Sequence, residues 1–158
     1  MAKKQATVVT FPQLQEVVDN LKKKYSVALG DVEPAQILYL KSDAEPKRGP
    51  KVARLSPIKV PHPSVTIFRF ALTVFAQYDE IDEARQVLHI LRELRRIEDF
   101  ERGKMGNCPL QDFPEIVEKY GTTWEDREDL DNPLEEKEAE ESLWYCTIFI
   151  VLNVVRKG

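Results

Sequence analysis

The stretch Asp79-Glu-Ile-Asp-Glu-Ala-Arg-Gln-Val-Leu-His-Ile-Leu-Arg-Glu-Leu-Arg-Arg-Ile-Glu-Asp-Phe100 decides the fold of this chain. Its apolar residues recur at helical spacing over five turns, which predicts one long amphipathic helix. The residues of this stripe are Ile81, Ala84, Leu88, Leu91, Leu94 and Ile97.

The sequence ahead of this helix predicts the strands of a sheet. Residues 65–75 are rich in β-branched and aromatic side chains, so we expect a buried, central strand there. Residues 37–41 predict a second strand, and residues 52–55 predict a third after an exposed, proline-containing loop. An amphipathic helix is predicted from Thr10, as its cap, to Lys24.

After the long helix, the sequence predicts one more short amphipathic helix, through residues 113–120. We expect residues 1–124 to form the core, residues 125–141 an acidic loop or mobile segment, and residues 142–158 a C-terminal strand that completes the same domain. The predicted fold class is α+β, in which a small mixed sheet packs against the long helix and two further helices. The segments expected in the sheet lie near Ile37, Val52, Val65 and Trp144.

Length and composition indicate one domain without a membrane segment. The chain has 158 residues, of which 42% are hydrophobic and 32% charged. No segment reaches the roughly eighteen uncharged apolar residues of a membrane span, and the N-terminus lacks a signal-peptide core, so we expect a cytoplasmic protein. The two cysteines, Cys108 and Cys146, are too few for a secreted disulfide framework, although a single disulfide between them stays open.

Residues 91–97 have the outline of a zinc-peptidase helix. A peptidase of the H-E-x-x-H type needs two histidines on one helical face, a glutamate that activates water, and a third ligand downstream. The corresponding turn here is Arg92-Glu93-Leu94-Arg95-Arg96, which keeps the glutamate and has arginine at both histidine positions. Arginine has no lone pair for a metal and stays positively charged, so this turn predicts that zinc binding has been lost.

Four pieces of sequence, in order, carry a resemblance to a known family. They are Ile81-Asp-Glu83, Arg92-Glu-Leu-Arg-Arg-Ile97, Cys108-Pro-Leu-Gln-Asp-Phe113 and Tyr120-Gly-Thr-Thr-Trp124. In these pieces the chain resembles the phage-type metallopeptidases, which are zincin-like and have H-E-L-x-H-I, H-D-x-x-D-F and Tyr-Gly-x-x-Trp in the same order. The resemblance covers about residues 10–124, which is most of the chain.

The resemblance implies a zincin-like fold and a degenerate member of that family. It makes Arg92, Arg96 and Cys108 the former ligand positions and Glu93 the vestigial catalytic residue. We expect no metal and no other cofactor, because one thiolate alone cannot hold zinc, and we expect Arg96 to pair with Glu93 or Glu98. The implied function is that of a catalytically inactive protein, of viral or mobile-element origin, which binds an unidentified macromolecular partner, a protein, in the host cell cytoplasm.

One alternative, a residual metal-dependent hydrolase that uses a histidine, keeps an enzymatic function open. In a second register, Arg85-Gln-Val-Leu-His89 is the motif, and His89 with Glu93 could form a half site for a metal. This register displaces the downstream pieces and loses the motif glutamate, so a surface histidine is the preferred interpretation of His89. His62 lies between prolines and is also predicted to be a surface residue.

Charge distribution favours a second alternative, nucleic-acid binding. Residues 1–60 carry eleven Lys or Arg against six acids, and the long helix adds a candidate polyanion-binding set. This set consists of Arg85, Arg92, Arg95 and Arg96. Residues 125–141 hold ten acids against two basic residues, so they could cover the basic face within the molecule or between copies. The apolar residues 144–155 need covering by the protein's own sheet or by a second copy, which leaves a homodimer open.

Overall fold

A computed structural model of the protein describes residues 6–25, 29–59, 66–103 and 114–135. This part of the chain is α+β, as expected, and contains a mixed sheet covered by helices. The strands are β1 (Val8–Thr10), β2 (Ile37–Ser42), β3 (Ala53–Pro57) and β4 (Phe70–Val74). The α-helices are α1 (Gln13–Lys24), α2 (Glu83–Glu101) and α3 (Pro114–Tyr120).

The strands of the sheet follow the order β1-β2-β4-β3. β4 lies inside the sheet, parallel to β2 and antiparallel to β3, which confirms the central position predicted for residues 65–75. The strand is shorter than predicted, however, since it begins at Phe70. Ahead of it, the Phe68 N–H donates to the Thr66 hydroxyl at 3.1 Å, a local turn that replaces sheet pairing and leaves Ile67 69% exposed.

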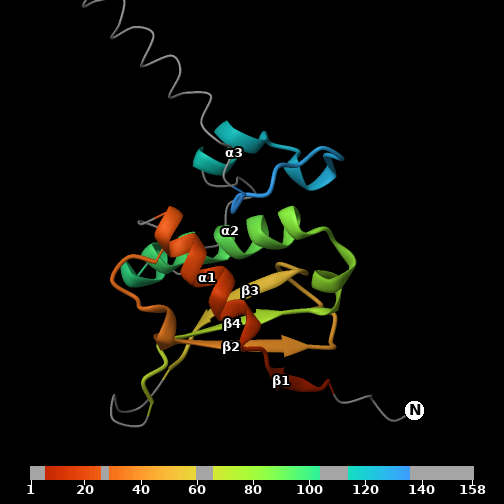
Figure 1. The fold of residues 1–158 in the computed structure, drawn as a ribbon. Helices are drawn as coiled ribbons and strands as arrows, with labels where there is room; N and C mark the ends of the chain where they lie inside the picture. The colour runs from red at the N-terminus through yellow and green to blue at the C-terminus, as the bar shows by residue number, and fades with distance from the viewer. Residues whose placement is uncertain (1–5, 26–28, 60–65, 104–113, 136–158) are drawn as a thin grey trace, which may run out of the picture.

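The molecule is built in layers, which Figure 1 shows. α1 and α2 cover one face of the sheet, and α3 with the segment after it lies on the far side of α2. In β2 and β4 alternate residues are buried, so one face of the sheet carries the core toward the helices. The fully buried side chains from both layers include Ile37, Leu72, Val74, Leu88, Leu94, Ile97 and Trp124.

α2 begins later than the sequence predicts. Asp79 and Glu80 belong to a 3-10 helix, Ala76–Glu80, and Asp82 is the N-cap residue of α2. The Asp82 carboxylate accepts the Arg85 N–H at 2.9 Å, which satisfies one of the unpaired amides at the helix start. The helix is followed by Gly103, whose φ of 69° favours glycine.

The first strand was not predicted. Thr10, expected as a helix cap, instead ends β1, and Pro12 is the N-cap residue of α1. β1 is held by residues far along the chain, since the Phe11 N–H donates to the Tyr39 carbonyl at 2.9 Å. Three residues are too few to carry a local sequence pattern that would predict this pairing.

Several predictions fall outside the described residues. They concern His62, Cys108, the pairing of Cys108 with Cys146, and the C-terminal strand within residues 142–158. Among the helices that the structure describes, none is both long and apolar enough to cross a membrane.

We expect Leu94→Ala to lower the free energy of unfolding by about 2–5 kcal/mol, because its side chain on α2 is fully buried in the hydrophobic core. Urea denaturation measures this change. Ile67→Ala is the matched control, since its exposed side chain predicts a change within about 0.5 kcal/mol. Equal losses from the two substitutions would contradict the assignment of this core.

Candidate site around Glu93

Glu93 lies at the contact between α2 and β3. Glu93 is 2% exposed and is the one charged residue that is buried among those the structure describes. An ionised carboxylate in such surroundings needs partners that replace its lost hydration. Its surroundings therefore decide what this residue can do.

Two donors meet one oxygen of this carboxylate. The Leu55 backbone N–H donates to Glu93 Oε2 at 2.8 Å, and the Arg96 guanidinium donates to the same oxygen at 2.7 Å. Leu55 lies in β3, so the carboxylate joins the helix to the strand, while Arg96 neutralises its charge from the next turn. The expected pairing of Arg96 with Glu93 is confirmed.

Arg92 and Arg96, which the resemblance places at the two histidine positions, have partners in different places. Arg92 pairs with the Glu125 carboxylate at 3.0 Å, in the layer beyond α2, whereas Arg96 pairs with Glu93 and lies over the Phe100 ring at 5.2 Å. Their guanidinium groups are cations without lone pairs, so neither can ligate a metal. Cys108, which the resemblance makes the third ligand position, lies outside the described residues.

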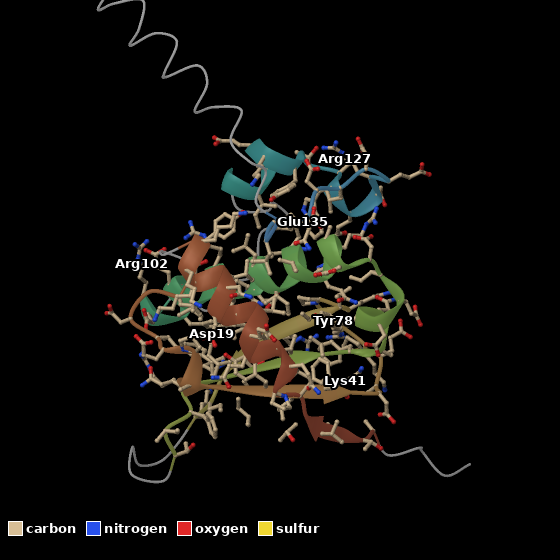
Figure 2. The ribbon with its side chains drawn as sticks, viewed as in Figure 1. Asp19, Lys41, Tyr78, Arg102, Arg127 and Glu135 are labelled. Carbon is tan, nitrogen blue, oxygen red and sulfur yellow. The ribbon has the colours of Figure 1, made fainter. Side chains whose placement is uncertain are left out.

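The first residues of the acidic segment lie on the basic side of α2. Arg85 donates to the Glu125 carbonyl at 2.8 Å, and it also contacts the Asp82 carboxylate and the Arg127 carbonyl. Figure 2 places Arg127 in the layer above α2, away from the sheet. Three of the candidate polyanion-binding residues, Arg85, Arg92 and Arg96, therefore have anionic or carbonyl partners within the molecule, and Arg95 is half-buried.

His89 lies between Arg85 and Arg92 on the same face of α2. Its ring lies 4.9 Å from the ring of Trp124 in an edge-on arrangement, and Trp124 is fully buried. His89 is half-buried rather than the surface residue that was predicted. The Glu93 carboxylate is turned to β3, and in the described ranges no three His, Cys, Asp or Glu side chains come together to hold a metal ion.

The pKa of Asp82 is lowered at the start of α2. Burial alone would raise it, but the hydrogen bonds from the Arg85 backbone N–H and guanidinium together outweigh burial. In the acidic segment, the Arg127 guanidinium hydrogen-bonds to Asp129 and lowers the pKa of its carboxyl below the usual value. Both shifts stabilise the charged forms.

Sequence reasoning missed two partners of the site, the Leu55 N–H and Glu125. Leu55 is 38 residues from Glu93 along the chain, and Glu125 is 33 residues from Arg92. A backbone amide carries no sequence signal. Only the excess of acids after residue 124 pointed toward Glu125.

No family model matches the chain, and no curated protein or solved structure is significantly similar to it. The predicted resemblance to zincin-like metallopeptidases therefore rests on the four sequence pieces alone. Of these, residues 108–113 lie outside the described part, and the other three lie on α2 and around the buried Trp124.

Arg96→Met should lower the free energy of unfolding by about 3 kcal/mol, because it keeps the aliphatic stem but leaves a buried carboxylate without its cation. Thermal or urea denaturation measures the loss. Arg102→Met is the matched control, because Arg102 pairs with Glu98 on the surface of the same helix and should contribute less than about 1 kcal/mol. A neutral Arg96→Met would show that Glu93 does not need this partner.

Asp82→Ala should destabilise the protein by about 1 kcal/mol at neutral pH, through loss of the helix cap. The folded-state pKa lies below 3.8, so this contribution is present above that pH and is lost as the pH falls through the folded-state pKa. Urea denaturation of wild type and variant should therefore converge in acid. Asp129→Ala is the control, because Asp129 is exposed and caps no helix. A difference that persists in acid would refute this role.

Proposed function

We propose that this protein is a catalytically inactive, zincin-like protein that acts by binding another protein. The observation that carries the proposal is the buried Glu93 carboxylate, whose Oε2 accepts hydrogen bonds from Leu55 and Arg96. In an active enzyme of the H-E-x-x-H type, this glutamate has to reach a metal-bound water. Here the same group joins a helix to a strand.

The arginines support loss of the reaction by their chemistry. A zinc ion between Arg92 and Arg96 would face two guanidinium groups, which repel a cation and offer no electron pair. Arg96 further neutralises the carboxylate that would act as general base. The chain thus keeps the framework of the motif and uses its charged residues for internal pairing.

A binding role is the use that remains for such a framework. Such a role would suit a small domain of viral or mobile-element origin that acts in the cytoplasm of a host cell. The candidate partner is a protein, because the arginines that would contact phosphates have internal partners. For nucleic-acid binding, Arg85 and Arg92 would have to give up their contacts with Glu125 and contact phosphates instead.

Restoring the histidines tests the zincin-like kinship. We expect wild type to bind no stoichiometric zinc and to hydrolyse no peptide, whereas Arg92→His with Arg96→His should bind zinc at least about tenfold more tightly than either single variant, because two ligands on one helical face act together. Isothermal calorimetry with ZnCl2 measures the affinity. Arg95→His with Arg102→His is the matched control, since these positions are two turns apart and neither lies one turn from His89.

Two results would overturn the proposal. Stoichiometric zinc in wild type together with peptide hydrolysis would make the protein a residual metal-dependent hydrolase. A double histidine variant that binds zinc no better than its control would remove the zincin-like kinship.

Gel retardation at low salt separates the nucleic-acid alternative from a protein partner. We expect wild type to retard neither DNA nor RNA, while Glu125→Lys, which replaces the partner of Arg92 with a repelling charge, should strengthen any retardation. Glu118→Lys on α3 is the control for added charge, because Glu118 is exposed and is not the partner of Arg92. Salt-sensitive binding by wild type would favour nucleic acid as the partner.

A further inference from the structure

The two edges of the sheet are finished in different ways. Along β3, every second residue forms backbone hydrogen bonds with β4, and Ile58, just beyond the strand, belongs to this series. The backbone groups of the residues in between, Ala53, Leu55 and Pro57, therefore point away from β4, toward the outside of the sheet. Leu55 gives its outward N–H to Glu93, and Pro57 has no N–H. This edge is therefore closed to a further strand by features that natural sheets use for that purpose.

β1 forms the opposite edge and has none of these features. The Phe11 N–H donates to β2, and by the alternation of an antiparallel pair Val9, opposite Lys41, bonds to β2 as well. The backbone groups of Val8 and Thr10 therefore point outward. In the part of the chain that the structure describes, no strand pairs with this side. Val8 and Val9 are 54% and 51% exposed, and β1 contains no charge or proline.

The chain holds one segment that suits this edge. Of the twelve residues 144–155, ten are apolar and none is charged, and β-branched side chains are frequent. Such a composition predicts a strand. An apolar strand of this length that is left unpaired in water is an aggregation hazard, so it needs an edge to pair with.

The described chain ends within reach of β1. The Glu135 carbonyl accepts from Lys24 Nζ at 3.0 Å, at the C-terminal end of α1, while β1 immediately precedes the other end of this helix. A helix of 12 residues is about 18 Å long. The eight residues 136–143 can span up to about 28 Å, which is more than the length of α1.

We propose that residues 144–155 pair with the outer side of β1 in the same chain and cover Val8 and Val9 as an additional edge strand. Pairing within one chain is favoured over pairing with a second copy, because a short linker holds the segment at an effective concentration of the order of millimolar. Two copies joined through β1 alone would share only the outward groups of Val8 and Thr10. The inference does not depend on the proposed function.

Hydrogen exchange of the full chain, followed by NMR, tests the pairing. The Val8 and Thr10 amides should exchange at least about tenfold more slowly than unstructured amides, because they donate to the added strand. Ile150→Pro should remove this protection, since proline lacks a donor and disturbs the strand. Glu138→Pro, in the linker, is the matched control and should retain the protection, while Leu72 in β4 reports whether the core stays folded.

A photo-crosslinking residue at Val8 provides an independent measurement. Mass spectrometry should find crosslinks to residues 144–155 within monomeric protein, at a yield that does not change with protein concentration. Three results would overturn the proposal: unprotected Val8 and Thr10 amides in wild type, protection that survives Ile150→Pro, or protection and crosslinks that grow with concentration. The last of these would assign the edge to a second copy.

Discussion

The structure depends on one buried carboxylate. Glu93 is the residue through which α2 holds an edge strand of the sheet, and its partners Leu55 and Arg96 are both needed to offset the loss of water around it. Such an arrangement favours a defined register between helix and strand more than it adds stability, because a well-packed apolar pair can be equally stable. The surrounding core, with side chains such as Leu94 and Leu72, supplies the larger part of the favourable free energy.

On the outer side of α2, acidic and basic residues neutralise one another. Glu125 binds Arg92 through its carboxylate and Arg85 through its carbonyl, and the chain continues past the buried Pro133 to Lys24 on α1. Figure 2 shows Glu135 close to the helical layer. The charge asymmetry of the sequence is therefore partly resolved inside the molecule.

Much of the fold could be predicted from sequence because its signals are local and periodic. The apolar stripe of α2 and the β-branched residues of β4 gave the class and the order of the main elements. β1 could not be predicted, since three residues form a strand there only because β2 lies beside them. In the same way, the sequence predicted that Arg96 pairs with Glu93 or Glu98, and the structure shows Glu93. The backbone amide of Leu55 has no signature in the sequence and becomes a partner only through folding.

The unequal edges of the sheet set a limit on how copies of this chain can associate. The side of β3 that meets Glu93 and Pro57 offers almost no donors, so strand pairing can proceed from β1 alone. A further strand, whether from the same chain or from a second copy, is therefore expected at one side of the described sheet only, because the carboxylate that anchors α2 also takes an outward donor on the other side.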